Sequence, residues 1–272
     1  MLARAHQSMV WSRQRQQNQL RSTLREFFPA ALEAFDDLAS GDALGVLAMA
    51  STPAQGRALS RSKIASALRR GGRQRRIEER AIEIQTALRS EHLEASPTVA
   101  GAMGASVAAL VAVITALVAQ TENLERELAD RFEQHPDAKI IRSLPGLGTI
   151  LGARALGEFG DDPNRYADAK SRKNYASTSP ITKASGKQRV VLARYARNRH
   201  LADTCRMWAL AAITASPGAR AFYDERRANG DTHNRALRAL ANRLVGILHG
   251  CLRHGTLYDE HTAWAHRITI AA

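Results

Sequence analysis

A glycine-rich turn is the first feature of this sequence with chemistry suited to phosphates. It spans residues 144–149 and reads LPGLGT, and it precedes an apolar run with helical character. Gly146 and Gly148 would let the backbone approach a phosphate, and the free N–H groups of the following helix would point at it. This pattern predicts a helix-hairpin-helix element anchored by Leu144 and Leu147. A glycine-rich helix end followed by a second helix would explain the same residues without any ligand.

A basic segment follows the turn. Between residues 170 and 199 there are nine cationic residues and no Asp or Glu, and a folded segment of one charge sign is naturally compensated by a polyanion. We therefore predict that these two features form a nucleic-acid surface. Its predicted residues are Gly146, Gly148, Thr149, Lys170, Arg172, Lys173, Lys183, Gly186, Lys187, Arg189, Arg194, Arg197, Asn198 and Arg199.

The whole composition agrees with a polyanionic partner. The 272 residues include 39 Lys and Arg against 26 Asp and Glu, a formal net charge of +13. Most of the positive charge is arginine, which suits bidentate contact with phosphate. A basic ribosome-associated or membrane-surface protein would share this balance. The length is sufficient for one large domain or two modest ones.

Other features argue against membrane, metal and disulfide roles. The longest apolar stretch, Val107–Ala119, falls short of the roughly 20 residues that a membrane span requires. The amino terminus has no apolar signal-peptide core. Cys205 and Cys251 have no second cysteine or histidine at zinc spacing. We expect a cytoplasmic, nucleoid-associated protein that binds no metal, no other cofactor and no membrane.

Hydrophobic spacing predicts a mainly α chain, because no stretch sustains a period of two residues. Residues 1–28 and 232–254 have the pattern of long helices. We expect a short helix at 165–176, a loop at 177–187 and renewed helical structure from about Gln188 to Ser216. The apolar runs at 190–192 and 268–270 are too brief to predict strands.

Residues 103–128 carry an apolar heptad with one polar interruption at Thr121. A coiled coil that joins two chains and a helical hairpin within one chain would both bury this stripe. For the first alternative, which would make the protein a homo-oligomer, the predicted contact residues are Val107, Leu110, Ile114, Leu117, Leu124 and Leu128.

An ordered set of short motifs resembles the IS110 type of insertion-sequence transposase. The matching segments are 144–148, 175–180, 185–186, 197–201, 222–223 and 233–237, and the order and spacing agree over roughly Ile140–Asp259. Members of that family pair an amino-terminal RuvC-like nuclease domain, with four acids that hold divalent metal, with a carboxy-terminal serine domain. The resemblance implies DNA binding and RNA-guided strand exchange during transposition.

The resemblance also implies a catalytic residue, because the serine of the family's Ser-Gly motif corresponds to Ser185. In the family this serine forms a covalent phosphoserine link to DNA. Lys183, Lys187 and Arg189 are close enough in sequence to hold the scissile phosphate and offset developing charge. Alternatively, Ser185 is an ordinary loop serine in a DNA-contact segment. Arg197 and Asn198 are expected to contact phosphate or nucleic acid, or else to cap a helix.

The four metal-binding acids of the family have no counterpart here. Asp36, Asp37, Asp161 and Asp162 do not match those motif positions, and converging carboxylates are needed to hold two metals. We therefore expect a truncated copy that lacks the RuvC-like domain, with Mg²⁺ required only where that domain is supplied. The expected segments are a basic helical linker at 1–98, a coiled-coil helix at 99–135, the serine transposase domain at 136–260 and a tail at 261–272.

Three functions are consistent with these features. The first is a transposase that needs a metal-bearing domain from another chain. The second is a non-catalytic nucleic-acid-binding remnant or a modulator of full-length transposase. The third is a hairpin-bearing DNA-repair glycosylase with Asp161 or Asp162 as its catalytic acid, although no base-binding pocket is evident.

Overall fold

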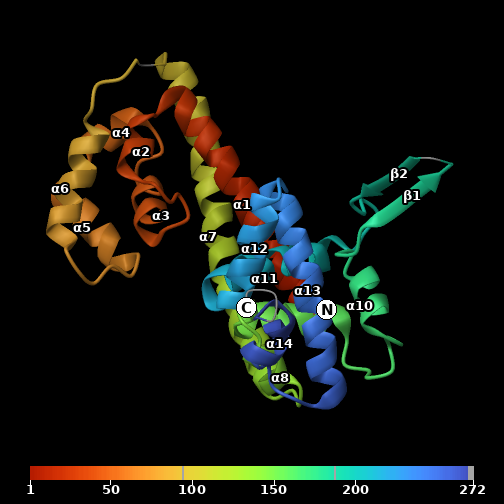
Figure 1. The fold of residues 1–272 in the computed structure, drawn as a ribbon. Coiled ribbons are helices and arrows are strands. Elements are labelled where there is room, and N and C mark those ends of the chain that lie inside the picture. Colours follow the sequence, from red (N-terminus) through yellow and green to blue (C-terminus); the bar gives the residue numbers. More distant parts are fainter. Residues whose placement is uncertain (94, 187, 269–272) are drawn as a thin grey trace. The chain divides into compact units, whose positions relative to one another are not determined.

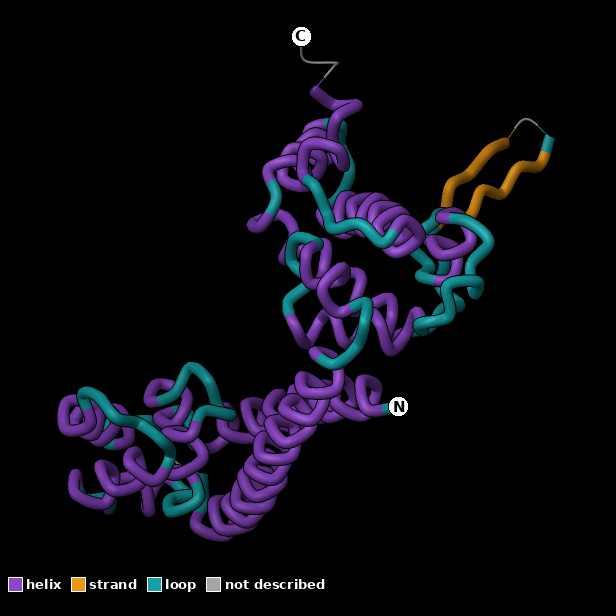
Figure 2. Tube along the Cα trace, turned by 90° about the horizontal axis from the view of Figure 1, so that it is seen from below, coloured by secondary structure: helices purple, strands orange, loops and turns teal. Residues whose placement is uncertain are grey.

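The chain is mostly helical, as predicted. The computed structural model describes residues 1–93, 95–186 and 188–268 (Figures 1 and 2). It divides into two compact units, one formed by residues 1–7 and the chain from 124 onward, the other by residues 8–123. The two long helices α1 (Leu2–Phe27) and α7 (Pro97–Glu133) each contribute residues to both units. The segment boundaries expected from the sequence stay a prediction.

In the described part of residues 8–123, five shorter helices follow one another in sequence between those two long ones. Local capping sets their starts: Ser40 and Ser60 accept hydrogen bonds from the first turns of their helices, and Thr52 forms a capping box with Gln55. The apolar core includes the fully buried Phe27 and Phe28. The five helices are α2 (Ala30–Ala34), α3 (Gly41–Leu47), α4 (Pro53–Ala58), α5 (Arg61–Arg70) and α6 (Ile77–Leu88).

The predicted heptad stripe lies on α7 and is partly buried within the chain itself. Val107 and Ile114 belong to the same apolar cluster as Leu20 and Leu24 of α1, and both views show these parts of α1 and α7 side by side (Figures 1 and 2). Leu128 is buried in the core of the other unit, whereas Leu110, Leu117 and Leu124 are half-buried. The intrachain alternative therefore accounts for the buried members, and association of two chains stays a prediction.

Helix α7 is long and apolar enough to cross a membrane. It has 37 residues and contains an 18-residue window with a mean hydropathy of 2.3, of which 22% is buried. The prediction from Val107–Ala119 was wrong on this point, because small uncharged residues extend the uncharged run to 95–121. Length and composition alone do not separate such a helix from a core helix. In this chain its buried side packs into the core of residues 8–123.

The other unit is built around α11, with Trp208 fully buried at its centre. The Trp208 indole N–H donates to the carbonyl of Pro145 at 2.9 Å, which fastens α11 to the glycine-rich turn. The helices of this unit are α8 (Ala138–Ser143), α9 (Thr149–Phe159), α10 (Ala169–Tyr175), α11 (Arg199–Ala215), α12 (Pro217–Ala228), α13 (His233–His254) and α14 (Glu260–Ile268).

A β-hairpin replaces the predicted loop and the start of the predicted helix. Strand β1 (Ile181–Ser185) pairs antiparallel with β2 (Gln188–Leu192), and Ile181 lies opposite Leu192. The prediction of a loop to residue 187 and of helix from Gln188 was therefore wrong. The β-branched residues favour extended backbone, but five-residue strands are too short to show a clear period. Figures 1 and 2 show the hairpin extending away from the helices of its unit.

The glycine-rich turn joins α8 to α9, and its two glycines have different surroundings. Leu144 and Leu147 are buried as predicted. Gly146 has a φ of +80°, and a Cβ there would lie 2.6 Å from the backbone nitrogen of Ala212 in α11. Gly148 has an ordinary φ of −70°, and nothing lies within 4 Å of the Cβ position. Only Gly146 is therefore required by backbone conformation and packing.

We predict opposite outcomes for alanine at these two positions. Gly146→Ala should lower the free energy of unfolding by at least about 2 kcal/mol, because it combines left-handed strain with a backbone clash. Gly148→Ala should change it by less than about 1 kcal/mol, the usual scale of a helix-cap substitution. Urea unfolding of both variants beside the parent chain measures the difference. Equal stabilities would contradict the packing described here.

Candidate nucleic-acid interface and nucleophilic serine

Ser185 is the last residue of β1 and stands beside the turn of the hairpin. It lies opposite Gln188, and Gly186 takes a left-handed φ of +54°, as two-residue hairpin turns require. The Ser185 side chain is exposed and forms no hydrogen bond with the rest of the described chain. Its hydroxyl is therefore open to a large external substrate, and the described protein provides no general base beside it.

The cations nearest to Ser185 in sequence are only partly described. Lys187 lies outside the described residues, and so do the side chains of Lys183 and Arg189, although their backbones belong to the strands. Arg194 follows the hairpin and donates to the carbonyl of Ser179 at 3.3 Å. This bond links the chain leaving β2 to the chain entering β1.

The remaining predicted cations differ in exposure. Lys170, Arg197 and Arg199 are exposed, and Lys173 is half-buried. Arg172 is instead in the core at 4% exposure, with its guanidinium 4.7 Å from the centre of the Tyr166 ring. Burial lowers the pKa of Arg172. Its cation–π contacts hold α10 against the helical core, so it lies away from the surface that a phosphate reaches.

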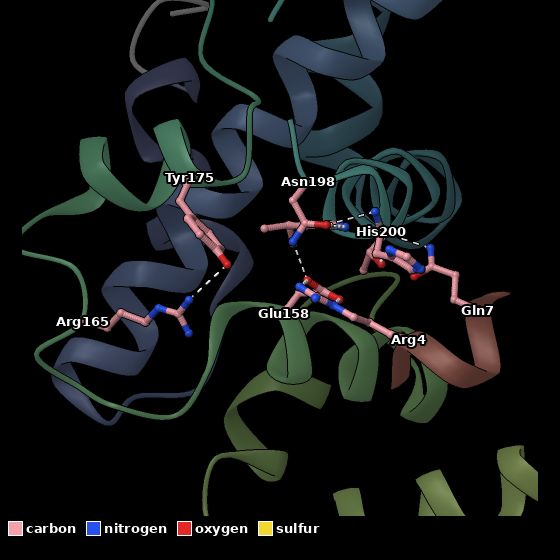
Figure 3. A network of polar contacts seen from close by, with 9 residues as sticks. Arg4, Gln7, Glu158, Arg165, Tyr175, Asn198 and His200 are labelled. Atoms are coloured by element: carbon pink, nitrogen blue, oxygen red, sulfur yellow. Dashed lines mark hydrogen bonds and ion pairs between the residues drawn. The ribbon is translucent and has the colours of Figure 1, made fainter. Parts of the chain in front are cut away.

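Asn198 begins α11 and ties it to a buried carboxylate (Figure 3). Its side-chain oxygen accepts from the backbone N–H of His200 and Leu201, a helix cap, and its amide donates to Glu158 at 2.5 Å. The capping role expected as one alternative is therefore present. Direct contact with nucleic acid stays a prediction.

Glu158, called the buried hub below, is a buried carboxylate that joins several helices, and the sequence analysis did not predict it. It is 3% exposed and accepts two hydrogen bonds from the guanidinium of Arg4, at 2.7 and 2.9 Å. Burial alone would raise the pKa of the Glu158 carboxyl, but the hydrogen bonds from Arg4 and Asn198 outweigh it, and the pKa is lowered. Gln7 adds a contact between α1 and α11 by donating to Asp203 at 2.9 Å.

The turn between α10 and β1 is fixed by a second unforeseen residue, Asn242 of α13. The side-chain oxygen of Asn242 accepts from the hydroxyls of Thr178 at 3.1 Å and Ser179 at 3.3 Å. Ser177 in the same turn has a left-handed φ of +59°. Asn242 thus holds the base of the hairpin, and nothing local in the sequence connects it with residues more than sixty positions earlier.

The turn at Gly148 presents an open backbone, but it has an acid nearby. Gly148 is exposed and has no side chain to cap α9, so the first N–H groups of that helix lack a side-chain partner from the cap residue. The hydroxyl of Thr149 donates to Glu133 at 3.2 Å, and Glu133 also pairs with Arg142. A phosphate at this helix end would adjoin the Glu133 carboxylate.

Two other chemistries receive no support from the described residues. Within residues 1–93, 95–186 and 188–268, no three His, Cys, Asp or Glu side chains gather as metal ligands would. Burial raises the pKa of the Cys205 thiol to about 12, so this cysteine is a poor nucleophile. A requirement for Mg²⁺ with a separate domain stays a prediction.

Comparison with known proteins covers this same region. The profile of the Transposase IS116/IS110/IS902 family matches residues 138–224, which include the glycine-rich turn, the hairpin and Asn198. The chain is also 42% identical, over its full length, to the mini-circle protein of Streptomyces coelicolor to which the transposase role of IS117 is ascribed. The alignment covers 67% of that relative.

The chain belongs to the IS110 family of insertion-sequence transposases. Two further relatives agree, each 32% identical: a 42 kDa protein of insertion element IS900 from Mycobacterium paratuberculosis, over 87% of this chain, and a 43.6 kDa protein of IS110 from Streptomyces coelicolor, over 59%. The chain spans 59% and 40% of the lengths of these two relatives. The described hairpin and glycine-rich turn thus lie within the residues 138–224 that the family profile matches.

We predict that Glu158→Gln destabilises this transposase unit. The neutral amide leaves Arg4 without its carboxylate, and the free energy of unfolding should fall by about 1–3 kcal/mol at neutral pH. Because the pKa of Glu158 is lowered, its contribution is present above the ordinary carboxylate pKa of about 4.3 and is lost as the pH falls below it. The variant should therefore lose less stability on acidification.

Urea unfolding at a series of pH values measures both effects. Glu127→Gln is the matched control, because Glu127 pairs with Arg131 on the surface of α7 and both side chains are mostly exposed. The control should resemble the parent chain. If Glu158→Gln unfolds at the same urea concentration as the parent at every pH, the buried hub is not a stabilising contact.

Proposed function

We propose that this IS110-family chain exchanges DNA strands during transposition with Ser185 as the nucleophile. The observation that supports this most directly is the placement of Ser185. It is exposed at the turn of a hairpin, beside a glycine with left-handed φ, within an acid-free basic segment. A DNA phosphate can approach such a hydroxyl without meeting a carboxylate from the same segment.

The chemistry balances without an external energy source. The Ser185 oxygen attacks phosphorus of a DNA phosphodiester, an O–P bond to serine forms, and one ester oxygen of the DNA leaves as a hydroxyl. The serine proton passes to solvent or to a base, and the leaving oxygen takes a proton in turn. A hydroxyl from another DNA end then attacks the phosphoserine and releases the serine. Each step exchanges one phosphodiester for another.

Other groups are needed to complete this site, because the described residues place no base beside Ser185. The family resemblance supplies a proposal: the four acids of a RuvC-like domain with Mg²⁺ act at the same phosphate, and a guide RNA selects the DNA. The proposed setting is the bacterial cytoplasm, on the nucleoid. The alternative is a nucleic-acid-binding modulator without activity.

A covalent-trapping experiment tests the nucleophile. The purified chain is incubated with labelled element-end DNA, guide RNA and Mg²⁺, with and without a separately made RuvC-like domain, and analysed on a denaturing gel. We expect a DNA–protein band that is abolished by Ser185→Ala. Thr182→Ala, which removes an exposed hydroxyl from the same strand, should leave the band intact.

The two conditions separate the proposals. A band that needs the added domain supports both the serine and the supplied metal centre. A band that persists in Ser185→Ala assigns the nucleophile to another residue. Salt-sensitive DNA binding without a band under either condition favours the modulator.

We also propose that two copies of the chain associate through the exposed side of α7. Six alanines at alternating spacings of three and four residues are exposed there, away from the buried side that contains Val107 and Ile114. The same alanine face on a second copy would fit against it, because both faces have heptad spacing. Residues 95–121 also contain no charged residue that would repel the second copy. The six are Ala102, Ala105, Ala109, Ala112, Ala116 and Ala119.

Charges on this face should abolish association. Ala109→Glu combined with Ala112→Glu alters exposed positions only, so the variant should fold and sediment as a monomer while the parent sediments as a larger species. Ser106→Glu is the control, because it places a charge on an exposed position about a quarter turn away. A monomeric parent chain, or a double variant of unchanged mass, would rule out this interface.

A further inference from the structure

Two adjoining cavities run along α13 in the unit that contains the hairpin. One has a volume of about 470 Å³ and the other about 320 Å³, and both are lined by Thr178 and Arg238. The larger is bounded by the base of the hairpin at Pro180 and Leu192, and the smaller by the beginning of α11. Because they share lining residues, they form one surface depression, here called the α13 groove.

The lining of the α13 groove is strongly cationic. The larger cavity is lined by Lys173, Arg226, Arg235, Arg238 and Arg243, and the smaller one adds Arg197 and Arg206. Among the described residues, no Asp or Glu lines either cavity. Four of these seven residues come from α12 and α13, outside the basic segment 170–199. The fold has therefore concentrated more positive charge at this point than the sequence segment alone contains.

Three of these cations are paired with acids, whereas two have no partner among the described side chains. Asp231 pairs with both Arg226 and Arg235, and Asp203 pairs with Arg206. Lys173 and Arg238 form no hydrogen bond or ion pair with any other described side chain. Cations left unpaired in a depression attract an external anion, and the concave, low-dielectric wall strengthens that attraction.

Size and position limit the kind of anion. Each cavity lies near the lower end of the range for small-ligand sites, about 300–1,000 Å³, so each can hold a nucleotide-sized group but not a duplex. Ser185 lies four residues beyond Ile181 at the base of β1, which is roughly 13 Å at about 3.3 Å per residue. A bound strand that leaves the groove past the hairpin therefore reaches Ser185 within a few nucleotides.

We propose that the α13 groove binds one unpaired nucleic-acid strand by its backbone phosphates, with Lys173 and Arg238 as principal contacts. This inference rests on the DNA-acting function proposed above, but it concerns binding and does not require Ser185 to be the nucleophile. The groove delivers a separated strand to the hairpin, and phosphate contacts make it tolerant of base sequence.

Fluorescence anisotropy with a labelled single-stranded DNA oligonucleotide, over a series of salt concentrations, tests this binding. Lys173→Gln combined with Arg238→Gln should weaken binding about 25-fold near 0.1 M salt, since each single-strand phosphate contact contributes about 0.7 to the slope of log affinity against log salt. The slope itself should fall by about 1.4. RNA of the same sequence and the corresponding duplex are measured in parallel.

The matched control is Arg131→Gln combined with Arg220→Gln. It removes two positive charges from exposed arginines that pair with Glu127 and Asp224 and do not line the groove. The control should bind nearly as well as the parent chain. Equal weakening in both double variants would mean that only net charge matters, and would overturn the proposal. So would unchanged binding by the groove variant, or an equally large effect on the duplex.

The measurements with single-stranded DNA and with RNA of the same sequence show which of the two the α13 groove binds. A selective loss for DNA, for RNA or for both supports the groove and names what it holds. The anisotropy assay follows binding alone and contains no covalent step. Failure of the covalent-trapping experiment therefore does not contradict strand binding in the α13 groove. Failure of the binding test does not contradict Ser185 as the nucleophile, which the trapping experiment tests separately.

Discussion

One buried carboxylate organises the unit that carries the hairpin. Glu158 accepts hydrogen bonds from Arg4 of α1 and Asn198 at the start of α11, so three helices meet at two oxygen atoms. An ionised carboxylate is tolerated at 3% exposure only because these donors replace its water. Asn198 also caps α11, and α11 holds the glycine-rich turn through Trp208. The position of the glycine-rich turn therefore depends indirectly on the hydrogen bonds of Glu158, through α11.

The hairpin has a different character from the core beneath it. Its base is held by Asn242 through two hydroxyls and by Arg194 through the carbonyl of Ser179, whereas Val190 and Val191 of β2 and Ser185 beside the turn are exposed. A two-stranded hairpin gains little stability by itself. An anchored base with an exposed end is consistent with the proposed role of Ser185, which would meet its substrate and the other catalytic groups together.

Helix α7 shows how one sequence pattern can serve two surfaces. Its larger residues, such as Val107 and Ile114, pack into the core of residues 8–123, while the alanines on the other side remain exposed. In the sequence, the heptad of larger apolar residues is easier to recognise than the alanines, and it led to the prediction of a coiled coil between two chains. The fold uses that side for its own core, because α1 is covalently tethered and α7 therefore meets it at high effective concentration.

The sequence by itself determined the helical class, the buried leucines of the turn, the basic segment and, through its ordered motifs, the transposase family. These properties depend on composition, on the spacing of nearby residues and on local capping, so the local sequence is sufficient to predict them. Only the tertiary structure decided that 181–192 is a hairpin, that Arg172 belongs to the core, and that Lys173 and Arg238 line one groove. Burial and charge clustering bring together residues that are far apart in the chain. The free energy of these contacts depends on tertiary packing, which a local sequence pattern does not predict.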